Sequence, residues 1–246
     1  MDKDFYLQYA AVEDQHWWFV GRRRIVNQVI RQLHLPKNPK IFEAGCGTGG
    51  NLSMLARHGQ VSAMELDEIA GKIANGRQVT QVKLGSLPDQ IPFTDQYDLI
   101  LILDVIEHLD DDLAALLALH SKLKPGGWLL VTVPAYQFLW SQHDDINHHK
   151  RRYVLPALKQ LVSKAGYTVH YGSYFNAFLF PVVALVRFLK NLLHLESNSV
   201  GSRDLDLPTK PINQFLTFLF ASERHFINRI KLPFGVSILL LAQKNL

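Results

Sequence analysis

The sequence predicts an α/β protein with a doubly wound, mostly parallel sheet, a helical segment before the sheet and a helical insertion before its last strand. Two observations predict this class. Short, continuously apolar segments recur between residues 41 and 171 and alternate with segments of helical periodicity, which is typical of parallel strands covered on both faces. This alternation stops at residue 175 and gives way to a long apolar region, before a last strand-like segment at 234–243.

The elements follow in the order that this class requires. Before Pro39, apolar residues recur at helical spacing, including Val20, Ile25 and Leu33, so we expect a helical start. The segment KPGG (124–127) has the composition of a turn. The expected strands are 41–44, 61–65, 79–84, 97–103, 128–133 and 167–171, and the expected helices are 52–58, 69–74, 110–123 and 155–165.

Three regions result from these elements. We expect an N-terminal helical segment or lid at 1–38, a sheet domain formed by 39–174 and 234–246, and an apolar helical insertion at 175–233. In parallel sheets of this kind, ligands bind at the carboxyl ends of the strands. Glu65 and Asp104 follow two of the strands and a glycine-rich segment follows another, so we expect the site there.

Composition excludes several classes of protein. The single cysteine, Cys46, rules out a disulfide framework within the chain. The net charge of +4 is a small basic excess, and no aromatic-rich binding module accompanies it, so we expect no nucleic-acid partner. The start MDKDFYLQYA has no apolar signal core. We expect a cytoplasmic protein, or one at the cytoplasmic face of a membrane.

The segment KIFEAGCGTGG (40–50) predicts a ligand that lies against the backbone, because glycine is needed where no side chain fits or where φ is positive. Its glycines match G-x-G-x-x-G and, counted from Glu43, also E-x-G-x-G-x-G. Glu65 ends the next strand, where a carboxylate can accept hydrogen bonds from ribose hydroxyls. The pattern indicates an adenosine-type cofactor and leaves an NAD-dependent dehydrogenase open.

Four segments together resemble a known family. FEAGCGTGG, AMELD, YDLILILDVIEHL and LKPGGWLLVTVP follow one another in the order and spacing of class I S-adenosylmethionine-dependent methyltransferases, and the resemblance covers roughly residues 38 to 172. It is closest to the branch that acts on small molecules and lipids. The resemblance implies S-adenosylmethionine as the cofactor and a Rossmann-like sheet of seven strands, in which 236–242 is the expected antiparallel strand.

The resemblance also implies roles for individual residues. Glu43 and the loop after it would hold the amino-acid end of the cofactor, Glu65 the ribose and Leu66 the adenine face. Ser86 and Leu87 would lie by the adenine amino group, although many relatives have Asp where Ser86 stands. Asp104 would face the reaction centre. The expected cofactor contacts are Glu43, Gly45, Cys46, Gly47, Gly49, Glu65, Leu66, Ser86, Leu87 and Asp104.

A hydroxyl acceptor needs a base, and two segments offer one. The loop 139–153 gathers histidines, acids and cations, so His143 and His148 are candidate bases, unless this is simply a polar surface loop. The segment DVIEHL offers Asp104 and His108, or it braces the next helix. Quinone-type O-methyltransferases resemble this segment and can place a divalent cation on it. Asp104, Glu107 and His108 are therefore the alternative metal ligands, although we expect no metal.

Candidate acceptor contacts come from two cationic and aromatic stretches. Arg151 and Arg152 could clamp an anion, and Trp17 and Trp18 could form a lid or a stacking wall, or a hydrophobic staple of the first helix. The expected substrate-binding residues are Trp17, Trp18, Arg151, Arg152 and Tyr153.

The insertion carries two strongly apolar segments, 175–195 and 212–230, with basic residues among them. They predict a helical cap over the sheet, a homodimer surface or an in-plane membrane anchor. We expect methyl transfer to a small or lipid-linked acceptor, by O-methylation. N-methylation of a small molecule, or a membrane-associated protein that binds S-adenosylmethionine without catalysis, stays open.

Overall fold

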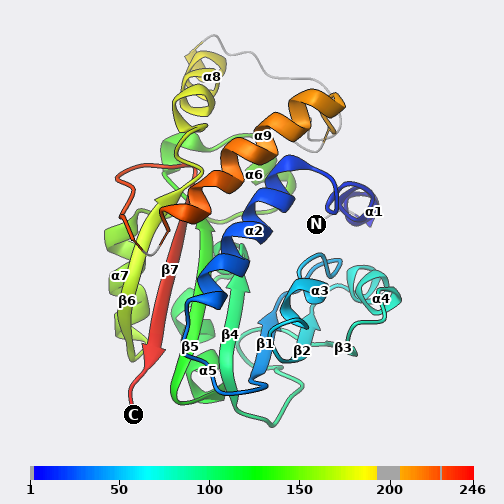
Figure 1. The fold of residues 1–246 in the computed structure, drawn as a ribbon, viewed down its shortest axis with the longest axis vertical. Helices are drawn as coiled ribbons and strands as arrows, with labels where there is room; N and C mark the ends of the chain where they lie inside the picture. The colour runs from blue at the N-terminus through cyan, green and yellow to red at the C-terminus, as the bar shows by residue number, and fades with distance from the viewer. Residues whose placement is uncertain (1–2, 193–205, 228) are drawn as a thin grey trace.

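The computed structural model describes residues 3–192, 206–227 and 229–246 and confirms the predicted fold class (Figure 1). Seven strands form one sheet in the order β3-β2-β1-β4-β5-β7-β6. β7 is antiparallel to both of its neighbours, and the other strands run parallel to one another. The strands are β1 (Lys40–Ala44), β2 (Gln60–Glu65), β3 (Val82–Leu84), β4 (Tyr97–Leu103), β5 (Leu123–Pro134), β6 (Tyr167–Phe175) and β7 (Ser237–Lys244).

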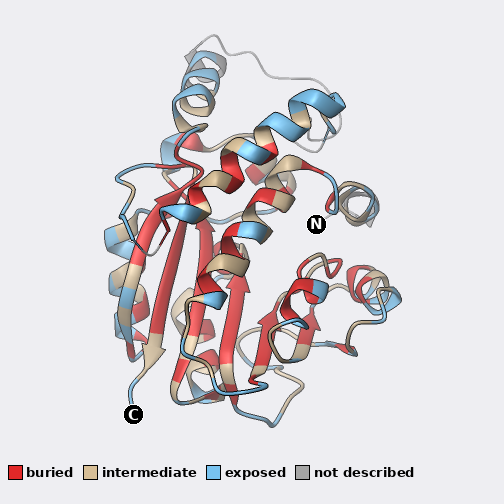
Figure 2. Ribbon diagram, viewed as in Figure 1, coloured by how far each residue is buried: buried red, intermediate tan, exposed pale blue. Residues whose placement is uncertain are grey.

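Helices cover both faces of the sheet (Figure 1). Alternate residues of β4 show this division: Leu99 and Leu101 pack with apolar side chains of α2 and α9, whereas Ile100 and Ile102 pack with those of α5 and α7. All four are fully buried (Figure 2). The helices are α1 (Lys3–Val12), α2 (Trp17–Arg31), α3 (Leu52–Leu55), α4 (Glu68–Gly76), α5 (Asp112–Lys122), α6 (Gln142–Ile146), α7 (Leu155–Lys164), α8 (Phe180–Leu192) and α9 (Lys210–Ser222).

Two local predictions differ from the structure. The helical start is broken into α1 and α2, because the chain turns at 13–16 and His16 caps α2 by accepting a hydrogen bond from the backbone N–H of Trp18 at 3.3 Å. The segment 124–127 is not a free turn but lies inside β5. The register between β4 and β5 shifts there, since Tyr97 pairs with Leu123 while Leu99 pairs with Trp128, so the extra residues are absorbed as a bulge.

The insertion is fastened to the sheet at one carboxylate. Glu223 is fully buried in the short 3₁₀ helix η4 (Glu223–His225), and it accepts hydrogen bonds from the backbone N–H groups of Asn176, Ala177 and Phe178 at 2.7, 2.7 and 3.0 Å. This contact fixes the chain that leaves β6. Residues 193–205 and 228 of the predicted insertion lie outside the described residues. None of the helices among the described residues is both long and apolar enough to span a membrane.

Candidate functional site

The glycine loop after β1 has the backbone that a close ligand requires. Gly45, Gly47 and Gly49 have φ values of +76°, +56° and +85°, a region that residues with a Cβ rarely adopt. A Cβ on Gly45 would lie 2.7 Å from a methyl carbon of Val105, whereas a Cβ on Gly47 would meet no atom within 4 Å. The loop therefore packs tightly at its start and faces open space at Gly47.

Glu43 lies in β1, just before this loop, and one of its carboxylate oxygens accepts no hydrogen bond from the described residues. The side chain is buried, and its Oε1 accepts a hydrogen bond from the Asn51 amide at 2.8 Å. Its Oε2 has no hydrogen-bond partner among the described residues. Burial raises the pKa of Glu43 to about 7. An unpartnered buried carboxylate oxygen costs free energy unless a ligand satisfies it, and a cationic amino group would do so.

Glu65 closes the loop from the end of β2. Its Oε2 accepts from the backbone N–H of Gly47 at 2.7 Å, and its Oε1 accepts from those of Leu66 and Asp67 at 2.9 and 3.1 Å. A carboxylate offers about four acceptor positions, so these three bonds leave room for one more. A ribose hydroxyl could donate to this remaining position without displacing any of the three N–H groups.

The N-terminal segment lies against the same loop. Glu13, which is buried, accepts a hydrogen bond from the Thr48 hydroxyl and pairs with Arg77. Arg77 also donates to the Thr48 carbonyl at 2.8 Å. A Cβ on Gly50 would collide with the Glu13 carboxylate. The N-terminal segment thus packs on the glycine loop through Glu13, a residue that was not singled out from the sequence.

A second contact from the N-terminal segment reaches Asp104. Arg22 of α2 forms an ion pair with Asp104, and its guanidinium carbon lies 4.6 Å from the centre of the Trp18 ring. Thr132 of β5 donates to the other oxygen of Asp104 at 3.2 Å. Burial lowers the pKa of Arg22 to about 10, which still leaves it charged at neutral pH. Both oxygens of Asp104 are thus engaged at the end of β4.

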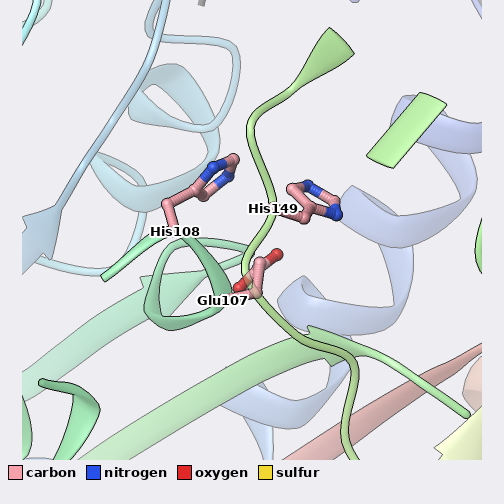
Figure 3. Close-up of side chains that lie close together, drawn as sticks. All are labelled: Glu107, His108 and His149. Carbon is pink, nitrogen blue, oxygen red and sulfur yellow. The ribbon is translucent and has the colours of Figure 1, made fainter. Parts of the chain in front are cut away.

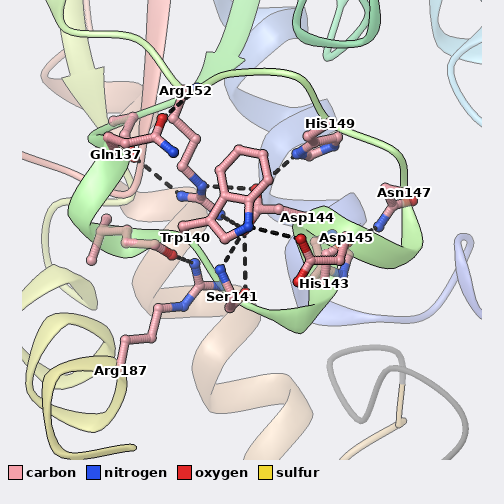
Figure 4. A network of polar contacts seen from close by, with 12 residues as sticks. Gln137, Trp140, Ser141, His143, Asp144, Asp145, Asn147, His149, Arg152 and Arg187 are labelled. Atoms are coloured by element: carbon pink, nitrogen blue, oxygen red, sulfur yellow. Dashed lines mark hydrogen bonds and ion pairs between the residues drawn. The ribbon is translucent and has the colours of Figure 1, made fainter. Parts of the chain in front are cut away.

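The loop 137–153 is organised around a single buried acid, Asp144 (Figure 4). Arg152 donates hydrogen bonds from Nε and Nη2 to the two carboxylate oxygens of Asp144, at 2.8 and 2.9 Å. His149 Nδ1 lies 2.8 Å from Asp144 Oδ1. The backbone N–H of Ser141 adds a fourth contact at 2.8 Å. Burial alone would raise the pKa of Asp144, but these donors outweigh it and hold the pKa well below its usual range.

His149 also lies close to the segment that follows β4. Glu107, His108 and His149 place one ligand atom each within 4.8 Å of one another (Figure 3). Glu107 is fully buried, and neither carboxylate oxygen has a hydrogen-bond partner among the described residues. Burial raises the pKa of Glu107 to about 8 and lowers that of His108 to about 4, so these two groups favour their neutral forms. Asp104 lies outside this group because it pairs with Arg22.

The predicted acceptor residues are mostly engaged in contacts within the protein. Arg151 donates to Asp112 at 3.0 Å and to the Leu109 carbonyl at 2.9 Å. The buried Tyr153 hydroxyl donates to the same Asp112 at 2.8 Å. Trp17 packs against Phe220 of α9, with ring centres 5.9 Å apart. The roles of these residues and of Arg152 in acceptor binding remain predictions, and any such role must coexist with these contacts.

The two histidines predicted as bases occupy different surroundings. His148 is exposed and has a positive φ of 56°, while His143 is half-buried, with its ring centre 6.2 Å from that of His149. Their catalytic roles stay predictions. His149, which the sequence interpretation passed over, is the member of the loop with a carboxylate fixed behind its ring. The sequence signal was the pair Asp144 and Arg152, eight residues apart on one loop.

The remaining predicted contacts lie in and after the glycine loop and at the ends of β2 and β3. Leu66 is 71% exposed at the end of β2, where its side chain can cover a flat ligand. The buried Cys46 donates its backbone N–H to the Met64 carbonyl at 3.0 Å. Ser86 pairs through its backbone with Gln90 rather than facing the loop through a fixed side-chain contact, and Leu87 packs at the rim of the core.

Comparison with known proteins gives one family and several relatives. Residues 16–171 match the family model described as "Methyltransferase domain". A ubiquinone biosynthesis O-methyltransferase of Idiomarina loihiensis is 32% identical over 142 residues, which is 48% of this chain and 56% of that protein. A probable S-adenosylmethionine-dependent methyltransferase of Mycolicibacterium smegmatis is 28% identical, over 65% of this chain and 62% of its own length. The chain thus matches less than two thirds of either relative.

Among solved structures, phosphoethanolamine N-methyltransferase 2 of Haemonchus contortus, in complex with S-adenosyl-L-methionine, superposes with a TM-score of 0.58 at 15% identity. The match covers 90% of this chain and 52% of that one. At this identity, the superposition establishes a shared fold alone.

Proposed function

Since the chain belongs to the methyltransferase-domain family, we propose that this S-adenosylmethionine-dependent methyltransferase transfers its methyl group to an oxygen atom of a small or lipid-linked acceptor. Membership of the family also decides against the NAD-dependent dehydrogenase that the glycine pattern alone left open. The similarity to a ubiquinone biosynthesis O-methyltransferase supports oxygen as the acceptor atom.

One observation carries the cofactor assignment. Glu43 and Glu65 end neighbouring parallel strands, and the positive-φ glycines lie between them with open space at Gly47. The unpartnered Oε2 of Glu43 suits the ammonium group of the cofactor's methionine part. Glu65 suits the ribose and Leu66 the adenine face, with Ser86 and Leu87 near the adenine amino group. S-adenosylmethionine supplies an already activated methyl group, so the chain's own task is alignment and water exclusion.

The chemical step is an in-line displacement. The acceptor oxygen forms a bond to the methyl carbon as the carbon–sulfur bond breaks, and the electron pair of that bond stays on sulfur. The positive charge of the sulfonium disappears, and a hydroxyl acceptor must lose its proton. Asp104, paired with Arg22 at the end of β4, would lie close to the cationic end of the donor. The half-buried Trp17 and Trp18 would then cover the acceptor from the lid.

For the proton, we assign the base to His149. Its Nδ1 is hydrogen-bonded to the anionic Asp144, which fixes the ring and leaves Nε2 as the basic nitrogen. Arg152 in turn holds Asp144, so the three residues form one oriented chain. His143 stands next to His149 and His148 lies at the surface, and either would serve as base only if the loop moved.

N-methylation of a small molecule is the second candidate, since the fold is shared with a phosphoethanolamine N-methyltransferase. An amine acceptor needs only to arrive unprotonated, so His149 would then be dispensable. A protein that binds S-adenosylmethionine without turnover is the third. These alternatives make different predictions for the same set of variants.

The test combines calorimetry with methyl transfer. Isothermal titration should show binding of S-adenosylmethionine and S-adenosylhomocysteine and none of NADH. Transfer of a labelled methyl group to a panel of phenols, catechols, amines and membrane extracts then identifies the acceptor. Loss of turnover in His149→Ala with unchanged cofactor affinity supports O-methylation. Full turnover in that variant, with an amine as the accepted substrate, would favour N-methylation.

A further inference from the structure

We propose that the exposed faces of α8 and α9 seat this protein on an anionic lipid bilayer, so that the acceptor enters from the membrane side. The proposal goes beyond the methyl transfer itself and does not depend on which atom is methylated. It rests on the exposed side chains of the insertion, on their charges and on their position in the fold.

The first observation is a continuous apolar stripe on α8. Val182, Leu185, Val186 and Leu189 are 63, 58, 45 and 42% exposed. Their spacing of i, i+3, i+4 and i+7 places them on one side of the helix. An apolar stripe of this kind normally packs on a core, but here it faces solvent (Figure 2). Such a stripe is a surface that needs a partner.

Aromatic side chains extend this stripe at the base of α8. The rings of Phe178 and Phe226 lie 6.2 Å apart, and those of Phe180 and Phe234 lie 5.4 Å apart. Phe178, Phe226 and Phe234 are 44, 39 and 43% exposed, and Ile230 beside them is 54% exposed. Phenylalanine at such exposure is suited to insertion between lipid headgroups and acyl chains.

The second helix repeats the pattern. On α9, Ile212, Phe215 and Phe218 recur at a spacing of three and are 53, 62 and 71% exposed. The opposite side of the helix is buried: Phe220 stacks with Phe175 of the sheet, with ring centres 5.9 Å apart. Therefore α9 already has its core partner, and the outer stripe is additional to it. Both helices stand at the same end of the molecule (Figure 1).

Positive charge accompanies these stripes. The exposed Arg229 and Lys231 flank the exposed Ile230, whose carbonyl accepts a hydrogen bond from the Tyr171 hydroxyl of β6, and Lys210 begins α9. Lys210 also lines a groove of about 650 Å³ between α9 and α2, together with the exposed Arg24 and the apolar Leu207 and Phe218. Asp14 is an acid in the same groove, but it pairs with Arg23 and Arg77. Cations beside exposed apolar groups match the anionic headgroups of a bilayer.

This charge also argues against a second copy of the chain as the partner. A two-fold dimer interface places each surface patch against itself. Such an interface would bring the cations Lys210, Arg229 and Lys231 of both copies together, and like charges across an interface disfavour association. A bilayer with anionic lipids removes this penalty. Since α8 has 13 residues, its length of about 20 Å is too short to cross the hydrocarbon core, so it would lie in the plane of the surface.

The position in the fold connects this surface to the chemistry. α8 follows β6 directly, and β6 runs parallel to β5 because both are antiparallel to β7. The apolar surface therefore lies at the same edge of the sheet as the glycine loop and Asp104. A protein seated in this way presents its acceptor side to the bilayer. An apolar acceptor could then reach the site without crossing water.

The experiment is flotation of the purified full chain with vesicles of phosphatidylcholine, alone or mixed with phosphatidylglycerol. We expect binding to the mixed vesicles, weaker binding at high salt and little binding to phosphatidylcholine alone. Val182→Glu/Leu185→Glu and Phe215→Ser/Phe218→Ser should each lower the partition coefficient at least tenfold. Arg229→Glu/Lys231→Glu should lower it for the mixed vesicles. Leu117→Glu, at a 49% exposed leucine on α5, is the matched control and should bind like the wild type.

Several outcomes would overturn the proposal. The absence of binding to mixed vesicles would do so, and so would an equal loss in Leu117→Glu. A dimer in solution that Val182→Glu/Leu185→Glu dissociates would identify a second copy as the partner instead. Titration with S-adenosylmethionine checks that each variant is folded. Vesicle binding could persist although neither the wild type nor any variant binds the cofactor. That outcome would overturn the proposed methyl transfer and leave the proposed membrane surface supported.

Discussion

The proposed cofactor side, around Glu43 and Glu65, and the proposed acceptor side, the loop 137–153, use carboxylates in opposite ways. On the proposed cofactor side, one oxygen of Glu43 has no partner among the described residues, and Glu65 accepts hydrogen bonds from three backbone N–H groups. On the acceptor side, Asp144 is surrounded by Arg152, His149 and Ser141. A carboxylate with spare capacity is available for a ligand, whereas a saturated one holds the protein together.

Polar side chains in a loop can stabilise the loop itself or bind a ligand, and this difference distinguishes the two cases. The loop 137–153 has the composition of an active site, yet most of its polar atoms are used to hold the loop in place. The role that we propose for this loop in the chemistry rests on His149, whose ring Asp144 orients. The glycine loop carries fewer charged groups, but more of their bonding capacity is left for a ligand. Variants of the two sides should therefore affect different quantities.

The largest expected effect is on stability and comes from the acceptor side. Arg152→Ala leaves Asp144 buried beside a histidine without its bidentate partner, because the Arg152 and Asp144 side chains are only 3 and 0% exposed. We expect the free energy of unfolding in urea to fall by about 3–5 kcal/mol. The matched variant Arg151→Ala breaks a pair whose side chains are 34 and 15% exposed, and it should lose about 1 kcal/mol. Equal losses in the two variants would show that the difference in burial between the two pairs does not set their contribution to stability.

The next effect is on cofactor binding and comes from the cofactor side. Glu65→Ala removes the acceptor for the ribose and the group that orders the Gly47, Leu66 and Asp67 amides. Calorimetry should show the affinity for S-adenosylmethionine falling at least about 100-fold, or about 2.7 kcal/mol. Glu68→Ala is the control, since Glu68 makes an exposed pair with Lys72 nearby. Unchanged affinity in Glu65→Ala would remove the ribose assignment.

The fold and the positive-φ glycines of the loop after β1 could be predicted because strand periodicity and glycine spacing are local in sequence. Other features depend on contacts between distant segments: Arg22 reaches Asp104, Glu13 reaches Thr48, and His149 reaches the segment of Glu107. The periodicity of one segment does not predict side-chain contacts with a distant segment. For the same reason the two arginines at 151 and 152 look alike in sequence but differ in burial.

A smaller effect concerns pH and tests whether Glu43 is available. Burial raises its pKa to about 7, so below pH 7 the carboxyl is largely protonated and must lose its proton to bind an ammonium group. The affinity for S-adenosylmethionine should therefore rise from pH 6 to pH 7.5, by roughly fivefold to tenfold. In Glu43→Gln the affinity should be lower at pH 7.5 and nearly independent of pH over this range. A parallel slope in wild type and Glu43→Gln would assign the pH dependence to another group.

The smallest effect concerns Leu66, which contributes contact area and no charge. Its side chain is 71% exposed in the ligand-free chain, so its truncation removes no core packing and should leave the free energy of unfolding unchanged. If Leu66 covers the adenine, Leu66→Ala loses part of an apolar contact worth about 0.5–1 kcal/mol, and the cofactor affinity falls about twofold to fivefold. Leu84→Ala, at a leucine 53% exposed on the neighbouring strand β3, is the matched control and should bind like the wild type. A loss of equal size in both variants would mean that this rim responds to general changes in packing, and the adenine would have to be placed elsewhere.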